Sequence, residues 1–466
     1  MIHTIELSKI LEDYVDETGK LCRAEDKFVE LISHLHLERR NKTCYATTRF
    51  AAQGFPMIRL YKMKTEVTKQ DMFGGQQQTT MYFYMLCLTI NPSSMFGGDP
   101  HISTNILSFT PDYTKAIYRK IFDLIPCLEY QVERKDLFFR CSLNDCGNCA
   151  NNCLELYKQY DKEWSEKNFF RVHRIDFTYD TALTPQQYLT LINRGYTLRK
   201  NTYERTYYDD NDGQKESVDG EPTIPDYEDL LDGYHSDVSY IYYKGKSVNI
   251  NIYHKGTEIE KEKLDFNPER NYEFLRIEVQ VKKDKLNAIL TKLKKYELDG
   301  YSEVQRRELH FLATPEVEEY VLNYYVNKLT GTGLYVPYSL ALSIVDGSNH
   351  TNREKEKMKA ILHEINQRQG IAKMLELVEN GTITDLGKLP TVKKYLRMIH
   401  ELGINPVTIP TRADAPKITL HSTCGNETLK TGMMLSLVDV IKGYAEQTRE
   451  DRKFGIPISE EDLKNL

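Results

Sequence analysis

The 466-residue sequence lacks any apolar run of about 18 residues, so we expect no transmembrane helix. Its first residues, MIHTIELSKILEDYVDE, are acidic and lack the basic stretch and apolar core of a secretory signal peptide. No internal repeat and no tail of biased composition is found. The composition, 40% hydrophobic and 28% charged, is typical of a soluble globular protein of about two or three domains.

The chain also lacks a basic excess, since its formal net charge is −6. That average hides one acidic segment, because residues 201–240 hold 12 acidic and 2 basic residues, a balance of −10. The remainder holds 60 basic and 56 acidic residues, a balance of +4, so a nucleic-acid partner is not excluded. We interpret residues 201–236 as an acidic loop that covers a site, mimics DNA or aids solubility.

Nine cysteines without a secretion signal are expected to be mostly reduced. Four of them lie close together with the spacing of a metal site, and two of these flank a Gly-Asn step that suits a tight turn: Cys141, Cys146, Cys149 and Cys153. We expect them to bind a structural Zn²⁺ that stabilises an insertion at 126–165. Unligated thiols and an iron–sulfur cluster are the alternatives.

Hydrophobic periodicity indicates the fold class. Residues 1–40 are predicted to be helical, because Phe28, Leu31 and Leu35 follow a helical spacing. The run MYFYMLCLTI at 81–90 is typical of a strand buried on both faces.

Further along, Thr110 and Pro111 predict the start of a helix. From Thr314 onward the pattern is almost wholly helical. We therefore expect an α+β fold with one broad antiparallel sheet, followed by a mostly helical C-terminal region.

Three predicted strands, RVHRIDFTYD, SVNINIYHK and EFLRIEVQVKK, carry polar residues at every second position. Alternate side chains of a strand share a face, so neighbouring strands would combine their polar sides into one surface. Its charged and phenolic members are Arg174, Asp176, Asp180, Tyr253, Lys255, Arg276 and Glu278. Carboxylates beside Arg and Lys favour Mg²⁺ or Mn²⁺, and a tyrosine beside such a metal can attack a phosphodiester. The alternative is a solvated sheet face with surface ion pairs.

Three segments in this order resemble the rolling-circle replication initiators of Gram-positive plasmids, the Rep_trans family. They are RIDFTYDTALTPQQYL, YIYYKGKSVNINIYHKGTE and LRIEVQVKKDKL. The family pattern is an R-x-D-x-x-x-D strand with a helix after it, a stretch ending in I-Y-x-K-x-x-E, and an R-(I/V)-E strand. The segment ILSFTPDYTKAIYRKIF is also similar to an earlier strand and helix of the family. The resemblance covers about residues 100–295 with insertions.

Members of the family nick one strand at a replication origin through a tyrosine. The tyrosine forms a 5′-phosphotyrosyl bond and leaves a 3′-hydroxyl for a polymerase. The resemblance places the nucleophile at Tyr253 and the Mg²⁺- or Mn²⁺-binding carboxylates at Asp176 and Glu278, with Asp180 as a further ligand. It implies that phosphates are held by Lys255, Arg276 and Arg174. Arg174, Lys282 and Lys283 are also expected to contact DNA. The implied fold is an antiparallel sheet of the HUH-endonuclease, ferredoxin-like kind, without the usual paired histidines.

The sequence departs from the family pattern in two places. Tyr242 or Tyr243 stands where the family has a glycine, and Gln280 replaces the second acidic residue of the last strand. These departures leave the ligand set open. His34-Leu-His36 matches the metal motif of the wider nuclease superfamily, but its helical surroundings favour an ordinary helix face.

The C-terminal segment LPTVKKYLRMIHELGINP is similar to the second part of a helix-turn-helix. It starts with a proline, stops at Gly403 and carries Lys393, Lys394 and Arg397, so it is suited to a major groove. The alternative is an amphipathic helix with a solvated basic side. The predicted domains are a helical segment at 1–50, the endonuclease domain at 51–312 and a helical domain at 313–466.

The leading hypothesis is a metal-dependent enzyme that nicks and rejoins one DNA strand and so starts rolling-circle replication of a plasmid, phage or integrative element. The expected partners are origin DNA, single-stranded or extruded, and a host helicase; a homodimer is left open. The expected location is the bacterial cytoplasm, with no membrane partner. The alternatives are a relaxase for conjugative transfer, a non-cutting DNA-binding regulator of the same fold, and a host-interaction protein that acts through its acidic loop.

Overall fold

The computed structural model of the protein describes residues 1–15, 21–70, 76–130, 162–164, 166–181, 192, 194–195, 203–209, 238–262, 264, 266–270, 272–293, 308–368, 370–408, 438 and 441. They belong to two compact units built from separate stretches of chain. In the described part, the first unit consists of Met1–Asp176 and Val281–Val317, and the second of Phe177–Gln280 and Glu318–Asp451. Both contain helices and strands, which confirms the predicted α+β class. The linear boundaries at 50 and 312 stay a prediction.

The first unit contains a sheet with the strand order β4-β5-β6-β7-β1, and the first half of β8 follows β1. Its neighbours from β4 to β1 are antiparallel. The strands are β1 (Ile2–Leu11), β4 (Glu38–Arg39), β5 (Cys44–Thr47), β6 (Met57–Gln70), β7 (Gln76–Ile90) and β8 (Arg171–Thr181); β2 (Tyr14–Val15) and β3 (Leu21–Cys22) form a separate pair.

The first strand corrects the expectation that the chain begins as a helix. Residues of Ile2–Leu11 pair with β7, whose part from Leu86 to Ile90 is buried and, except for Thr89, apolar. This long-range pairing buries Ile5 and Leu7 and overrides the local propensity of the segment. The helical spacing that suggested a helix holds further along, in α1 (Ala24–His34).

The helices of the first unit begin as their sequences indicate. In α3 (Pro111–Leu124), the Thr110 hydroxyl accepts a hydrogen bond from the Tyr113 amide at 3.2 Å, which confirms the predicted cap. The other helices are α2 (Pro92–Met95), α8 (Lys283–Lys292) and α9 (Leu309–Leu312), with 3₁₀ turns at Ala51–Gln53, Ile106–Ser108 and Pro126–Leu128.

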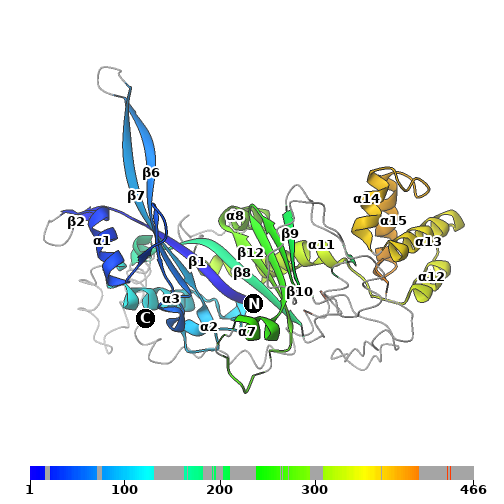
Figure 1. The fold of residues 1–466 in the computed structure, drawn as a ribbon, viewed down its shortest axis with the longest axis horizontal. Coiled ribbons are helices and arrows are strands. Elements are labelled where there is room, and N and C mark those ends of the chain that lie inside the picture. Colours follow the sequence, from blue (N-terminus) through cyan, green and yellow to red (C-terminus); the bar gives the residue numbers. More distant parts are fainter. Residues whose placement is uncertain are drawn as a thin grey trace, which may run out of the picture. The chain divides into compact units, whose positions relative to one another are not determined.

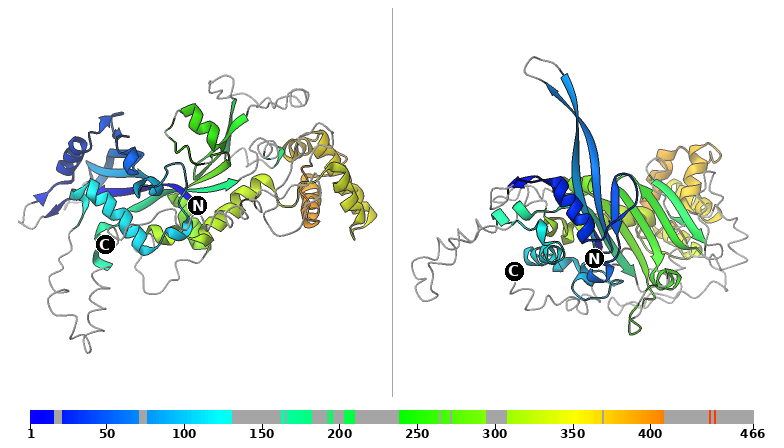
Figure 2. Two further views of the ribbon diagram at one scale, coloured as in Figure 1. Left: turned by 90° about the horizontal axis from the view of Figure 1, so that it is seen from below. Right: turned by 60° about the vertical axis from the view of Figure 1, so that its left-hand side comes forward.

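A long hairpin formed by β6 and β7 extends beyond the other strands of this unit (Figures 1 and 2). The prediction that residues 81–90 are buried on both faces is confirmed from Leu86 to Ile90 but is wrong for Met81 and Tyr82, which are exposed. The reason is that β1 ends its pairing with β7 at Tyr84.

The second unit contains a sheet with the strand order β12-β11-β10-β9, and the second half of β8 lies beside β12. Strand β10 is antiparallel to both of its neighbours. The strands are β9 (Tyr203–Asp209), β10 (Val238–Gly245), β11 (Val248–His254) and β12 (Leu275–Lys282). The prediction of an acidic loop at 201–236 is wrong for residues 203–209, which form strand β9. The part of that loop from residue 210 lies outside the described residues.

Helix α7 (Lys255–Glu262), which the sequence patterns did not predict, lies between β11 and β12. The described chain from Pro315 onward is mostly helical, as predicted. It contains α10 (Pro315–Val321), a π-helical turn (Leu322–Val326), α11 (Asn327–Thr330), α12 (Tyr338–Gly347), α13 (Asn352–Gln367), α14 (Ile371–Glu379) and α15 (Leu389–Glu401). Helix α15 contacts α13 and α14, as Figure 1 shows. Among the described residues, no helix is long and apolar enough to cross a membrane.

Candidate active site

The central residues on the polar sides of β8, β11 and β12 are buried in the structure. Asp180, Arg276 and Glu278 all have exposed fractions of 6% or less, as does Tyr253. The alternative of a solvated sheet face is therefore wrong. A buried polar side chain must find hydrogen-bond partners or lose several kilocalories per mole, so these contacts decide what the site can do.

A bidentate ion pair joins β12 to β8 within the second unit. The Nε and one terminal nitrogen of Arg276 donate to the two carboxylate oxygens of Asp180 at 2.8 and 3.0 Å. Both side chains are fully buried. The remaining terminal nitrogen of Arg276 is buried and has no hydrogen-bond partner among the described residues. An unsatisfied buried guanidinium nitrogen is a ready donor for an anion such as a phosphate.

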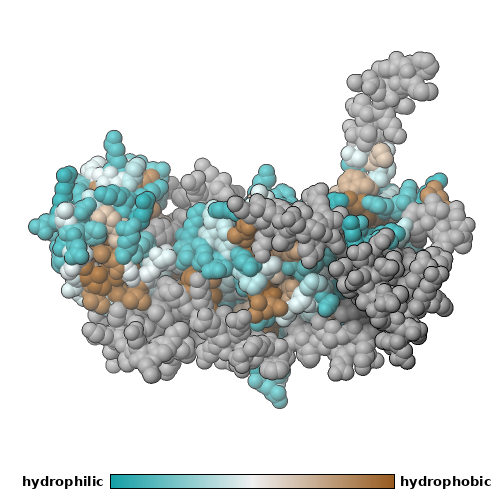
Figure 3. Space-filling model, turned by 180° about the vertical axis from the view of Figure 1, so that it is seen from behind, coloured by the Kyte–Doolittle hydropathy of each residue, from teal (hydrophilic) through white to brown (hydrophobic). Residues whose placement is uncertain are grey.

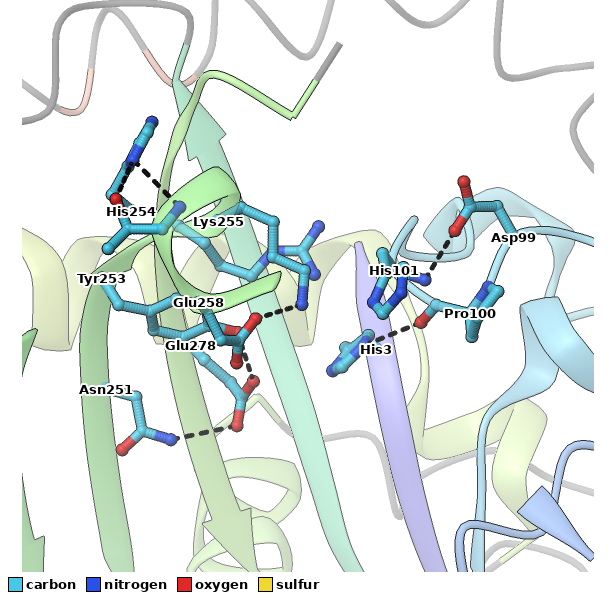
Figure 4. Close-up of polar contacts among 12 residues, drawn as sticks. His3, Asp99, Pro100, His101, Asn251, Tyr253, His254, Lys255, Glu258 and Glu278 are labelled. Atoms are coloured by element: carbon cyan, nitrogen blue, oxygen red, sulfur yellow. Dashed lines mark hydrogen bonds and ion pairs between the residues drawn. The ribbon is translucent and has the colours of Figure 1, made fainter. Parts of the chain in front are cut away.

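The carboxylate of Glu278 faces the hydroxyl of Tyr253 (Figure 4). The Tyr253 hydroxyl donates to one Glu278 oxygen at 3.4 Å, a long hydrogen bond. The other oxygen accepts from the side-chain amides of Asn251 at 3.2 Å and Gln280 at 2.7 Å. The two amides hold the carboxylate in place on one side and leave its other oxygen directed at the phenol.

Lys255 does not lie on the strand, as the sequence pattern suggested, but is the first residue of α7. Its ammonium group is ion-paired with Glu258, one helical turn further on, and lies 5.7 Å from the centroid of the Tyr253 ring. Figure 4 shows this pair beside the Tyr253–Glu278 contact. The site thus places a second cation near the phenol.

Burial shifts the ionisation of these groups. It raises the pKa of Tyr253 well above its usual value, the Glu278 charge adds to the rise, and Arg276 opposes it. Burial also lowers the pKa of Lys255, and Arg276 acts in the same direction while Glu258 opposes it. The phenol is therefore protonated at neutral pH, and its activation requires a base or additional positive charge.

Asp176 and Arg174 belong to the first unit. The Asp176 side chain is buried; it accepts a hydrogen bond from Thr4 and lies 2.8 Å from the Arg174 Nε. Arg174 also lies 3.9 Å from Glu6, and its side chain is partly exposed. Lys282 and Lys283, at the junction of β12 and α8, are half-buried.

The predicted DNA-binding helix is α15. Lys393, Lys394 and Arg397 are all exposed, whereas Val392, Leu396 and other apolar residues of the helix are buried. Nine residues connect α14 to α15, so this pair lacks the three- or four-residue turn of a helix-turn-helix. The predicted zinc ligands Cys141, Cys146, Cys149 and Cys153 lie outside the described residues.

The contacts that each carboxylate already makes decide whether it can bind a hard cation. Glu278 fits in kind, since its buried carboxylate supplies the oxygen ligands that a hard cation prefers and is not engaged by a cation through both oxygens. Asp180 fits poorly, because both of its oxygens accept hydrogen bonds from Arg276. Within the described residues, no group of three or more His, Cys, Asp or Glu side chains is placed to hold a metal ion.

Sequence reasoning missed three residues that position the site. Asn251 and Gln280 lie on the polar sides of the predicted strands, where the pattern gives no role to an uncharged amide, although such amides can hold a carboxylate. Glu258 is the last residue of the I-Y-x-K-x-x-E stretch, and its spacing of three from Lys255 would have signalled an ion pair once a helix start was recognised there.

Comparisons with known proteins add little to this geometry. No family model matches the chain, and neither does any curated protein. A solved structure of a rolling-circle replication initiator protein from Geobacillus stearothermophilus is similar to the chain with 8% sequence identity. The match covers 87% of this chain and 97% of that chain, with a TM-score of 0.23. A TM-score this low carries no argument about fold or function, so the resemblance rests on the sequence motifs.

Proposed function

We propose that the protein nicks and rejoins one strand of origin DNA, with Tyr253 as the covalent nucleophile and a sheet of the HUH-endonuclease kind as its scaffold. One observation carries the proposal: a buried tyrosine faces a carboxylate, beside a buried arginine nitrogen that has no partner among the described residues. This combination supplies a nucleophile, a proton acceptor and a hydrogen-bond donor for a phosphate in one place.

In the proposed reaction, the Tyr253 hydroxyl transfers its proton to Glu278 as its oxygen attacks the phosphorus of a phosphodiester. The new bond joins the phenolic oxygen to phosphorus, and the bond from phosphorus to the 3′-oxygen breaks. That oxygen takes up the proton that Glu278 accepted and leaves as a 3′-hydroxyl. The reverse reaction, attack by a 3′-hydroxyl on the phosphotyrosine, rejoins the strand.

The cationic side chains have separate roles in this scheme. The unpartnered nitrogen of Arg276 donates to a non-bridging phosphate oxygen, where negative charge increases in the transition state. Asp180 is a positioning residue that fixes the Arg276 guanidinium. Mg²⁺ or Mn²⁺, held by Glu278, would supply further positive charge at the phosphoryl group.

Trapping of the covalent adduct tests the proposal. Single-stranded oligonucleotides that tile the gene and its flanking DNA, labelled at the 3′ end, are incubated with the protein and Mn²⁺ and resolved under denaturing conditions. A 5′-phosphotyrosyl bond transfers the label to the protein. We expect Tyr253→Phe to abolish the labelled band. Tyr243→Phe is the matched control, because Tyr243 is also buried but lies in β10 opposite Ile250, on the apolar side.

Persistence of the labelled band in Tyr253→Phe would refute the assignment of the nucleophile. A second candidate function is a DNA-binding regulator that keeps the fold but does not cut. It is favoured by the burial of Tyr253 and Arg276, which leaves both side chains closed to a substrate in this structure. Salt-sensitive duplex binding with no adduct in any oligonucleotide would support that function instead.

A further inference from the structure

The helix that carries Lys255 begins with residues that are poor helix formers. Helix α7 opens with Lys255, Gly256 and Thr257. Glycine disfavours a helix by about 1 kcal/mol relative to alanine, and threonine is β-branched. A helix of eight residues is also too short to be stable by itself in water. The first turn of α7 therefore depends on contacts from outside the helix.

His254 supplies such a contact. It is the residue directly before α7, and its ring Nδ1 accepts a hydrogen bond from the backbone N–H of Thr257 at 3.3 Å. An N-terminal cap has this geometry, because the side chain before the first helical residue accepts from the third amide of the helix. Nδ1 also lies 2.8 Å from the Thr257 hydroxyl. Figure 4 shows His254, Lys255 and Glu258 together at this turn.

The backbone amide fixes the state of the imidazole. An amide N–H can only donate, so the Nδ1 that accepts from it carries no proton. In the neutral ring the proton is then on Nε2, which lies 3.2 Å from a carboxylate oxygen of Glu273. The His254 ring thus joins the start of α7 to the segment that precedes β12.

That segment packs against the same turn. The Lys255 amide donates to the Phe274 carbonyl at 3.0 Å, and a Cβ at Gly256 would meet a Glu273 oxygen at 2.7 Å, so glycine leaves room for the carboxylate. The Glu273 side chain is nevertheless 72% exposed. Residues 266–270 of the loop from α7 to β12 are exposed too, and Figure 3 shows their tip as a mostly hydrophilic projection at the bottom of the view. A charged contact so exposed contributes little, which leaves the Nδ1 cap as the stronger support of the turn.

The first turn of α7 decides where the Lys255 ammonium lies. Lys255 and Glu258 are three residues apart, a spacing that brings side chains together when the chain between them is helical. With the turn formed, the Lys255 side chain is 3% exposed and its ammonium lies 5.7 Å from the Tyr253 ring centroid. A buried ammonium needs such a partner, so loss of the turn would release Lys255 towards water.

We propose that His254 is a positioning residue, whose unprotonated Nδ1 caps α7 and thereby holds the Lys255 ammonium beside Tyr253. The cation then favours the negative charge that the phenolic oxygen acquires as its proton leaves. This part in strand cleavage rests on the proposed function, whereas the placement of Lys255 does not.

Two variants separate the cap from the bulk of the ring. His254→Leu keeps a large side chain without an acceptor, whereas His254→Asn restores a strong N-cap oxygen. The full chain is treated with acetic anhydride, and mass spectrometry follows acetylation of Lys255. His254→Leu should speed this reaction by about fivefold, the factor for loss of a typical N-cap, and His254→Asn should restore the slow reaction. Lys393, exposed on α15, is the internal reference and should react equally in all variants.

Glu273→Gln is the matched control. It removes the exposed charge beside Nε2 and leaves the Nδ1 cap in place, so Lys255 should react as in the unmodified protein. The second measurement is the rate of adduct formation with a saturating single-stranded oligonucleotide and Mn²⁺. This rate should fall about fivefold in His254→Leu and recover in His254→Asn.

Equal acetylation of Lys255 in His254→Leu and the unmodified protein would overturn the proposal, as would failure of His254→Asn to restore the slow reaction. Faster acetylation in His254→Leu with an unchanged adduct rate would refute the part of Lys255 in cleavage. If acetylation follows the expected pattern but the unmodified protein forms no adduct with any oligonucleotide, the cleavage proposal fails and the positioning role stands.

Discussion

Loss of one partner from the buried Asp180–Arg276 pair should destabilise the protein by about 3–5 kcal/mol. Both side chains have zero exposure, and two hydrogen bonds of 2.8 and 3.0 Å join them. Each charge-assisted bond contributes about 1.5–3 kcal/mol, which agrees with that range. Asp180→Asn keeps the shape but leaves the Arg276 charge without its bidentate partner in a buried position, so we expect about 3 kcal/mol for this variant.

The measurement is urea denaturation of the full chain followed by circular dichroism. The matched control is Glu38→Gln, which breaks the exposed pair of Glu38 and Arg40 at 3.5 Å and should cost less than about 1 kcal/mol. The double variant Asp180→Leu with Arg276→Met removes both charges and should recover most of the stability lost by Asp180→Asn. If Asp180→Asn costs no more than Glu38→Gln, the inference that the pair is desolvated is wrong.

Three further predictions follow from local geometry. Thr351→Ala removes the capping box at the start of α13 and should cost about 1 kcal/mol in urea denaturation. Gly370→Ala should cost about 1–3 kcal/mol, because its φ is +148° and an added Cβ would meet backbone at 2.5 Å, whereas Gly347→Ala, with open space around it, should be nearly neutral. Cys87 should resist alkylation at pH 8 in the native protein, as judged by mass spectrometry, since burial raises the pKa of its thiol to about 12.

Local patterns were sufficient for much of the secondary structure. The Thr-Pro step predicted α3 with its cap, and the alternation of polar and apolar residues predicted β8, β11 and β12. These features follow from interactions within a few residues, so one sequence can reveal them. The same reasoning failed for Ile2–Leu11, because that strand depends on a partner more than seventy residues away.

The candidate site, too, could be predicted only in part from the sequence. The chain alone nominated Tyr253, Arg276 and Glu278, because strand alternation places polar side chains on a common side. It could not show that Arg276 binds Asp180 with both oxygens engaged, or that Asn251 and Gln280 hold Glu278. Those contacts depend on which strands are neighbours and in what register.

The sequence by itself therefore determined the α+β class, the strands that carry the chemistry and the mildly basic body left once the acidic segment is set apart. Tertiary structure decided that the central residues of the polar strand sides are buried, that one buried arginine nitrogen has no partner among the described residues, and that part of an apolar strand is exposed in the β6–β7 hairpin. The physical reason is that periodicity is a local property of the chain. Burial and hydrogen-bond satisfaction depend on residues that meet only when distant strands pair.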